Sequence, residues 1–255
     1  MTPTQLFGIV AITVLLYMTA WFVLARLLQR ADAVDSAWGL GFVVVAWTAI
    51  FATGNHASSA LLGAVFVTVW GARLFTHITR RNLHKSEDYR YQAYREKWGK
   101  HFWPQAYVRI FLVQGLLLLL ISLPVIAIMH IGDTITVVAV VGFAVWATGI
   151  LYESVGDYQL QRFLKTRKKG EIMQRGLWKY SRHPNYFGEV SAWWGAAVVA
   201  GAYNQWWGVC GALVITILIT KVSGIPPLEK HYKGNPAYQE YAKHTSVLVP
   251  LPRRK

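Results

Sequence analysis

Long runs of apolar residues, separated by short polar connections, dominate the chain. Seven runs have about the length that a helix needs to cross the hydrocarbon core of a bilayer, which is roughly 20 residues. They cover residues 5–28, 36–52, 58–78, 108–129, 135–153, 187–202 and 206–220. The runs are continuous rather than alternating, so they do not match the strands of a closed β-barrel. The pattern predicts an all-α integral membrane protein, with seven transmembrane helices in a single domain of residues 1–255.

The first run does not have the pattern of a cleaved signal peptide. No basic residue precedes it, it is too long for the apolar part of a signal, and it ends in "RLLQR" rather than in small residues. We therefore expect it to be retained as a helix.

Basic residues gather in alternate connections between the runs. The chain has 26 lysine and arginine residues against 12 aspartate and glutamate residues, a formal net charge of +14. Three segments hold 22 of the basic residues: 80–100, 162–182 and 221–255. The connections "GNHA", "HIGDT" and "AYNQ" hold none. This alternation follows the positive-inside rule and predicts an outside N-terminus and a cytoplasmic C-terminus. It favours anionic lipid or an anionic ligand as the partner of the basic segments, and not nucleic acid.

The sequence contains no recognisable metal-binding pattern. The one cysteine, Cys210, lies in the last apolar run, so neither a disulfide within the chain nor a cysteine-based metal site can form. No two histidines have the spacing of a zinc-binding helix, and no acidic residues cluster around a histidine. We expect no metal ion.

Ionisable residues within or beside apolar runs are costly and therefore mark candidate sites. Asp35 stands at the start of the second run, where it either caps a helix or, if desolvated, stays protonated and donates a hydrogen bond. Arg73 and His77 are four residues apart near the end of the third run, so they share a helical face. The position of Arg73 within the run is explained by its long side chain, which can extend to the membrane interface. His77 is too short to do this, and a histidine within a span needs a polar partner.

A polar stripe follows where the fifth run leaves the membrane. Glu153 and Asp157 are four residues apart, and Arg162 and the cationic segment "KTRKKGE" come next. A solvated helix end explains Asp157 and Arg162, but Glu153 still has apolar neighbours. The residues of this stripe could form hydrogen bonds with an amide or with the hydroxyls of a ribose. The cations could bind either lipid head groups or phosphates. Neither GxGxxG nor GxxxxGK[ST] occurs, so side chains at helix ends would have to hold a nucleotide.

Two segments in the last third of the chain resemble a known family. The segments "RGLWKYSRHPNYFGEVSAWWG" and "PPLEKHYKGNPAYQEYAKHTSVLVPLP" are similar to the C-terminal half of the steroid 5-alpha-reductases, and particularly to their bacterial branch. The order "ES-GDYQ…GE…RGLWKYSRHPNYFGE" favours this family over the isoprenylcysteine carboxyl methyltransferases, which have similar "RHP" segments. The resemblance implies a monomeric, multi-pass enzyme of the bacterial inner membrane whose active site opens to the cytoplasm.

The resemblance also implies a reaction and a division of the chain. NADPH would bind to residues 151–255, the lipid substrate would lie with residues 1–150, and the product would be a 3-oxosteroid or other lipid ketone reduced at its conjugated C=C bond. Asp35 and His77 stand where the family has a glutamate and a tyrosine that polarise the substrate ketone, and are the expected catalytic pair. The cofactor-binding residues would be Glu153, Asp157, Arg162, Arg182, His183, Asn185, Tyr186, His231 and Tyr232.

In this interpretation the segment "RHPNYFGE" contributes residues that contact the cofactor. Arg182 and His183 can meet a phosphate, Asn185 can bond a carboxamide or a phosphate, and the Tyr186 ring can line the groove. Asn185 could instead cap a helix, and Tyr186 could be an interfacial aromatic residue. The excess of cations favours NADPH over NADH because the 2′-phosphate adds negative charge.

Two other functions stay open at this stage. A membrane methyltransferase that uses S-adenosylmethionine would use the same helix ends with fewer phosphate-pairing cations. A lipid-binding or scaffold protein would use the polar residues only to terminate helices, and would bind no cofactor.

Overall fold

The computed structural model describes residues 1–83, 85–130, 132, 135–168 and 170–253. Within these residues the regular structure is helical, apart from one isolated bridge between Ser181 and Ser246. The predicted all-α fold is therefore confirmed. The chain forms two compact units: Met1–Ile135 with Tyr203–Cys210, and Thr136–Ala202 with Gly211–Lys255. The single domain with a division at residue 150 stays a prediction.

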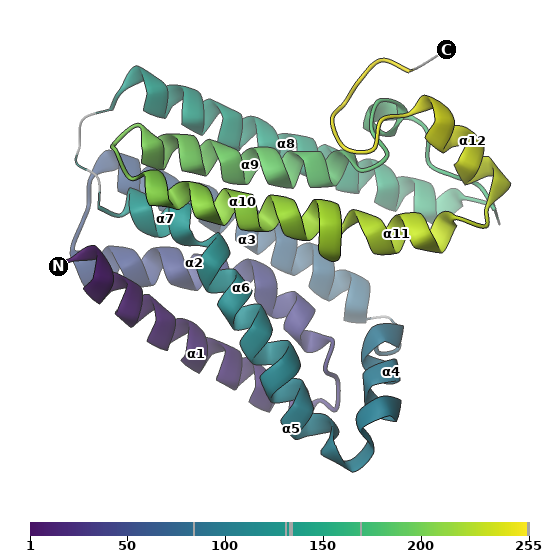
Figure 1. Ribbon diagram of the computed structural model, residues 1–255, viewed down its shortest axis with the longest axis horizontal. Helices are drawn as coiled ribbons and strands as arrows, with labels where there is room; N and C mark the ends of the chain where they lie inside the picture. Colours follow the sequence, from purple (N-terminus) through teal and green to yellow (C-terminus); the bar gives the residue numbers. More distant parts are fainter. Residues whose placement is uncertain (84, 131, 133–134, 169, 254–255) are drawn as a thin grey trace. The chain divides into compact units, whose positions relative to one another are not determined.

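The first unit begins with three long helices (Figure 1). Its elements are α1 (Pro3–Leu27), α2 (Ala33–Thr53), α3 (Ser58–Leu83), α4 (Tyr89–Trp98), η1 (Gly99–His101), α5 (Phe102–Ala106), η2 (Tyr107–Leu112), α6 (Val113–Ile121), α7 (Leu123–Ile128) and η4 (Trp206–Gly208). The elements from α4 to α6 follow one another as a single helical stretch. Helix α2 packs against both α1 and α3.

Local sequence signals set the ends and contacts of these helices. Thr2 caps α1: its hydroxyl accepts from the backbone N–H of Gln5, whose side chain bonds back to the Thr2 backbone. Gly54 ends α2 with a φ of 64°, a conformation that favours glycine. The contact between α2 and α3 also needs glycine, because a Cβ on Gly39 would lie 2.4 Å from the carbonyl oxygen of Gly71.

The second unit is built on a pair of long helices. Its elements are α8 (Val137–Thr166), η3 (Gly176–Lys179), α9 (Pro184–Gly201), α10 (Val209–Ile217), η5 (Leu218–Val222), α11 (Ile225–Tyr232) and α12 (Pro236–His244). The first two residues of α10 are assigned to the first unit. Asn235 caps α12, since its Oδ1 accepts from the backbone N–H groups of Ala237 and Tyr238 at 3.0 and 3.2 Å.

Helices α8 and α9 lie side by side in direct backbone contact (Figure 1). The glycines of this contact are Gly142, Gly149 and Gly156 on α8, and Gly188 and Gly195 on α9. A Cβ on Gly149 would lie 2.4 Å from the backbone nitrogen of Ala192, and one on Gly188 would lie 2.4 Å from that of Glu153. Small residues allow membrane helices to approach this closely. The contact brings the polar end of α8 beside the first turn of α9.

Six helical stretches of the described residues are long and apolar enough to cross a membrane. They are Pro3–Leu27, Ala33–Thr53, Ser58–Leu83, Tyr89–Ile121, Val137–Thr166 and Trp206–Tyr232. The run expected at 187–202 forms α9, which is not one of the six, since its first turns carry polar residues instead of apolar ones. Seven spans and the orientation of the termini therefore stay predictions.

Several helices extend beyond the predicted spans, whose limits stay predictions. Helix α3 continues to Leu83, past residue 78, and α8 continues to Thr166, past residue 153, while the helical stretch that contains the fourth run begins at Tyr89, before residue 108. The physical reason is that hydropathy marks where a chain leaves the apolar phase, and the backbone hydrogen bonds of a helix continue through polar residues beyond that point.

Substituting Gly149 with alanine tests the contact between α8 and α9. We expect Gly149→Ala to destabilise the protein by about 1–3 kcal/mol, because the new methyl group meets backbone that cannot move aside. The measurement is the thermal unfolding midpoint of the purified protein in detergent. The matched control is Gly8→Ala on α1, where a Cβ has no atom within 4 Å. Equal midpoints for the two variants would contradict the close contact.

Candidate functional site

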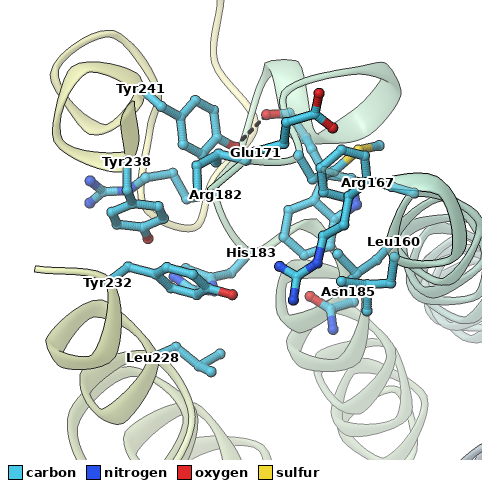
Figure 2. A pocket seen from close by; sticks show the side chains of 15 residues that line it. Leu160, Arg167, Glu171, Arg182, His183, Asn185, Leu228, Tyr232, Tyr238 and Tyr241 are labelled. Atoms are coloured by element: carbon cyan, nitrogen blue, oxygen red, sulfur yellow. Dashed lines mark hydrogen bonds between the residues drawn. The ribbon is translucent and has the colours of Figure 1, made fainter. Parts of the chain in front are cut away.

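The second unit contains a cavity at the polar ends of its helices (Figure 2). Its volume is about 130 Å³, several times the roughly 10–15 Å³ that holds one water molecule. It is formed by the end of α8, the segment after it, η3, the start of α9, and the helices α11 and α12. The lining residues are Leu160, Phe163, Leu164, Arg167, Glu171, Ile172, Met173, Trp178, Arg182, His183, Asn185, Leu228, Tyr232, Tyr238 and Tyr241.

The C-terminal tail fixes the segment that leads into α9. The backbone N–H of Arg182 donates to the carbonyl of Ser246 at 2.8 Å, and the hydroxyl of Ser181 donates to that of Leu248 at 2.7 Å. Pro184 then starts α9, a position where proline costs no helical hydrogen bond. These contacts hold the polar residues of "SRHPN" at the cavity wall.

A single carboxylate oxygen joins three elements around the cavity. Oε1 of Glu229 on α11 accepts from the Tyr238 hydroxyl at 2.7 Å and lies 3.0 Å from Nε2 of His183 and 3.3 Å from Nε of Arg182. Burial raises the pKa of Tyr238, and its hydrogen bond to Glu229 raises that pKa further, so the phenol stays a donor at neutral pH. Glu229 thus ties α11 and α12 to the start of α9.

Aromatic rings form one wall of the cavity. The rings of Tyr232 and Tyr238 are stacked, with centroids 4.9 Å apart and planes 21° apart. The Tyr241 hydroxyl donates to the backbone carbonyls of Trp178 and Ser181. Burial raises the pKa of Tyr241, which keeps its hydroxyl protonated for these bonds. Such a rigid aromatic wall suits the face of a planar ligand.

Asn185 presents a buried acceptor that no donor of the described residues reaches. Its Nδ2 donates to Oδ1 of Asp157 on α8 at 3.1 Å, which places the amide NH2 toward the carboxylate and the amide oxygen away from it. That oxygen, Oδ1, is buried and has no hydrogen-bond partner within the described residues. Leaving such an atom unpaired costs about 1–3 kcal/mol. Because Asn185 lines the cavity, a ligand N–H or O–H can remove that cost.

Cationic side chains also reach this cavity. Figure 2 shows the Arg167 guanidinium pointing between Asn185 and His183, from the segment that follows α8. Arg182 is nearly buried, with 11% of its side chain exposed, and is already engaged by Glu229. Arg167 is exposed and therefore better placed to take up an anionic group from solution.

The structure brings together most of the predicted cofactor residues. Four of the nine line the cavity: Arg182, His183, Asn185 and Tyr232. Three more lie directly behind these: Asp157, which bonds Asn185, Glu153, which is buried one turn earlier on α8, and Tyr186, whose ring stacks on His183. Arg162 and His231 are exposed and lie outside the lining. Their roles stay predictions.

The sequence interpretation did not include four residues that shape the cavity: Arg167, Glu229, Tyr238 and Tyr241. A signal for two of them exists, because Tyr238 and Tyr241 are three residues apart behind an Asn-Pro helix start and therefore share a face of α12. Glu229 gives no such signal, since its three partners come from two other segments of the chain.

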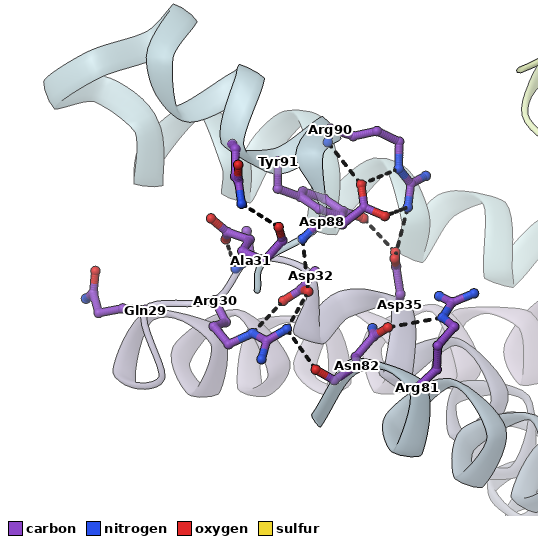
Figure 3. Close-up of polar contacts among 12 residues, drawn as sticks. Gln29, Arg30, Ala31, Asp32, Asp35, Arg81, Asn82, Asp88, Arg90 and Tyr91 are labelled. Atoms are coloured by element: carbon purple, nitrogen blue, oxygen red, sulfur yellow. Dashed lines mark hydrogen bonds and ion pairs between the residues drawn. The ribbon is translucent and has the colours of Figure 1, made fainter. Parts of the chain in front are cut away.

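Asp35 in the first unit is bound by side chains of α4 (Figure 3). Its Oδ1 accepts from the Tyr91 hydroxyl at 2.6 Å, and its Oδ2 accepts from Nη2 of Arg90 at 3.1 Å. The residue before α2 is Asp32, so Asp35 is not the N-cap. His77 is half-buried on α3. The pairing of Asp35 with His77 stays a prediction, and Tyr91 is a buried phenol that the sequence interpretation missed.

Ion pairs tie the connection between α1 and α2 to the segment before α4. Arg30 binds Asp32 through two hydrogen bonds of 3.0 and 2.8 Å, and the backbone N–H of Ala31 donates to Oε1 of Glu87 at 2.7 Å (Figure 3). Arg95 on α4 pairs with the same Glu87 at 3.1 Å. Throughout the described residues, no group of three or more His, Cys, Asp and Glu side chains is arranged to hold a metal ion.

The chain matches known proteins at two levels. The profile of a family described as "Protein of unknown function (DUF1295)" matches residues 21–245. Over 112 residues the chain is 30% identical to 3-oxo-5-alpha-steroid 4-dehydrogenase 1 of Homo sapiens and to that of Macaca fascicularis, and 27% identical to that of Bos taurus. These matches confirm the resemblance to the steroid 5-alpha-reductases.

The matches to these relatives are partial. Each covers 40% of the relative's length, and they cover 44%, 44% and 43% of this chain in the same order. No solved structure matches the chain.

Replacing Glu229 with glutamine tests the junction at the cavity. We expect Glu229→Gln to lower the thermal midpoint by the equivalent of about 1.5–3 kcal/mol, because the hydrogen bonds with Tyr238 and His183 and the ion pair with Arg182 are weakened together. The matched control is Glu240→Gln on α12, which removes an exposed carboxylate paired only with neighbours on the same helix and should leave the midpoint unchanged. A midpoint for Glu229→Gln equal to that of the control would show that this junction does not hold the helices.

Proposed function

This chain belongs to the DUF1295 family, and from that membership and its partial similarity to 3-oxo-5-alpha-steroid 4-dehydrogenases we propose that it is an NADPH-dependent membrane reductase. Its substrate would be a lipid ketone with a conjugated C=C bond, most simply the 4,5 double bond of a 3-oxosteroid. The observation that carries the proposal is a cavity lined both by Asn185, whose buried amide oxygen has no hydrogen-bond partner within the described residues, and by the exposed Arg167.

The residues of the cavity fit the groups of NADPH. The carboxamide NH2 of a nicotinamide can donate a hydrogen bond to the Asn185 amide oxygen, which has no partner within the described residues. Arg167 offers the fork of N–H groups that binds phosphate, and the Tyr232 ring offers a face for a planar heterocycle. The Glu171 carboxylate suits a ribose hydroxyl. When bound, NADPH would supply the hydride, and the protein would supply orientation and a dry environment.

The ketone must accept a hydrogen bond for its conjugated double bond to take up hydride, because negative charge then develops on the oxygen. One well-placed donor is typically worth about 3–4 kcal/mol to such a transition state. His77 is the proposed donor, since either ring nitrogen can carry a proton. Asp35 already accepts from Arg90 and Tyr91, so we propose that it acts through these partners rather than as a protonated acid.

We further propose that the protein crosses a bacterial inner membrane seven times, with α9 as the additional span, and acts as a monomer with its cofactor cavity on the cytoplasmic side. The three basic segments support this orientation, and the second of them, 162–182, includes Arg167 and Arg182 of the cavity lining.

Cofactor binding distinguishes this proposal from an S-adenosylmethionine-dependent methyltransferase. We expect NADPH to raise the thermal midpoint of the purified protein, with a gain of about 2.7 kcal/mol at one hundred times the dissociation constant. S-adenosylmethionine should have no effect. We expect Arg167→Ala to weaken NADPH binding at least tenfold, because a hydrogen bond between charged groups is worth about 1.5–3 kcal/mol.

The matched control is Arg162→Ala, which removes an exposed arginine outside the lining. It should bind NADPH like the original protein. An equal loss in both variants would mean that the basic run acts as a diffuse charge, and stabilisation by S-adenosylmethionine alone would replace the reductase proposal with the methyltransferase.

Turnover tests the reaction itself. Under anaerobic conditions we expect progesterone and NADPH to give the 5-alpha-reduced ketone with one NADPH oxidised per product. The double variant Asp35→Ala/His77→Ala should lose roughly two to three orders of magnitude in kcat, the typical loss on removing an oxyanion donor, while NADPH still raises the thermal midpoint. Unchanged turnover would remove the catalytic assignment of this pair and leave the cofactor assignment standing.

A further inference from the structure

The C-terminal tail, residues 245–253, carries a row of exposed apolar side chains. Val247, Val249 and Leu251 are 42%, 53% and 46% exposed, and the residues between them are half-buried. Tyr180, which follows η3, lies beside them: it is 43% exposed, and its carbonyl accepts from the backbone N–H of Leu251 at 3.0 Å. Apolar side chains that gather on a surface mark a place of contact with a partner or a membrane. These four residues are called the tail patch.

Hydrogen bonds hold the backbone of the tail patch in one conformation. The Ser181 hydroxyl donates to the carbonyl of Leu248 at 2.7 Å, and the backbone N–H of Arg182 donates to that of Ser246 at 2.8 Å. Because these bonds already fix the tail, its apolar side chains can meet a partner without the entropy cost of ordering a loose segment.

The tail patch is attached where α8 leaves its apolar run. That run ends near Glu153, and Gly156 follows about 4.5 Å further along the helix axis. The indole N–H of Trp178, two residues before Tyr180, donates to the carbonyl of Gly156 at 3.1 Å. Helix α8 is long and apolar enough to cross a membrane. The tail patch therefore lies close to the depth at which the acyl chains of a bilayer give way to head groups.

Exposed cations flank the tail patch. The Lys179 ammonium lies 5.8 Å from the centroid of the Tyr180 ring. On the other side Arg253 follows Leu251 by two residues, and its Nη2 donates to Oε1 of Gln174 at 3.2 Å. Both cations are exposed. Apolar side chains next to cations match an anionic membrane surface, because the former enter the acyl boundary while the latter bind head-group phosphates.

We propose that the tail patch, with Lys179 and Arg253, docks on the anionic head-group layer of the membrane that holds α8. The partner is a phospholipid surface of net negative charge, such as one that contains phosphatidylglycerol. An acidic protein would pair with the same cations, but the attachment of the patch beside the first polar turn of α8 favours lipid. The proposal does not depend on the reductase activity, since none of these residues lines the cofactor cavity.

A fluorophore on the tail tests this contact in the full-length protein in lipid nanodiscs. Cys210→Ala removes the chain's own cysteine, and Val249→Cys allows a bimane to be attached at the centre of the tail patch. In nanodiscs that contain phosphatidylglycerol, we expect nitroxide-labelled lipid to quench this bimane more strongly than aqueous iodide does. The matched control is Ala237→Cys on α12, which is exposed beside the polar Gln239 and Glu240 and should show the opposite order.

Removing the two cations tests the choice of an anionic surface. With the bimane at residue 249, Lys179→Gln and Arg253→Gln should each lower the ratio of docked to free tail roughly fivefold, the equivalent of about 1 kcal/mol per cation near an anionic surface. Nanodiscs of phosphatidylcholine alone should give the same loss without any substitution. The control pair Lys233→Gln and Lys243→Gln removes exposed cations outside the patch and should leave the ratio unchanged. All four positions are exposed, so thermal midpoints should stay within a few degrees of the original.

Three outcomes would overturn the proposal. Quenching by iodide alone would show that the tail patch faces water. Equal quenching by lipid in both kinds of nanodisc, or equal effects of the two pairs of substitutions, would show that anionic head groups are not its partner. Protection of residue 249 from both quenchers would show that a protein surface covers the patch instead.

Discussion

The direct backbone contact between α8 and α9 is the constraint on which the second unit depends. Glycine at positions such as 149 and 188 lets the two helices approach until a methyl group would collide with the opposite backbone. Gly156 continues the same contact beneath Asn185, so that Asn185 can reach Asp157 across the pair. A wider separation filled by larger apolar residues would stabilise a helix pair equally well, but it would break this hydrogen bond and move Asn185 away from the cavity.

Several side chains that line this cavity are held in place by hydrogen bonds to other side chains. Asp157 orients the Asn185 amide, and Glu229 collects the hydrogen bonds that hold His183 and Tyr238 in place. Each of these side chains has its orientation fixed by another residue before a ligand binds, which lowers the entropy cost of binding. The Asn185 oxygen and the Arg167 guanidinium remain available for a ligand. A cavity with a fixed acceptor and an exposed cation is suited to a ligand that carries both an amide and phosphates.

The sequence predicted the helical class and four of the fifteen residues that line the cavity, but not how they meet. Continuous apolar runs and the "RHPNYFGE" segment are local patterns, so they predicted the helices and placed Asn185 and His183 correctly at the start of a helix. Glu229 could not be found in this way, because its partners are distant in sequence and its own neighbours resemble a solvated helix. Arg162 lies outside the cavity lining whereas Arg167 belongs to it, and the spacing of a cationic segment does not distinguish the two; the role of Arg162 stays a prediction.

The charged side chains of the two units are paired differently, and this pairing affects which ligands each unit can bind. In the second unit Glu229 pairs with Arg182, while the exposed Arg167 and the carboxylate of Glu171 line the same cavity. In the first unit Arg30 and Asp32 form a bidentate ion pair, and Arg30 also donates to the backbone carbonyl of Asn82. The charges of this pair are therefore engaged within the protein, whereas the exposed guanidinium of Arg167 can bind an anionic group.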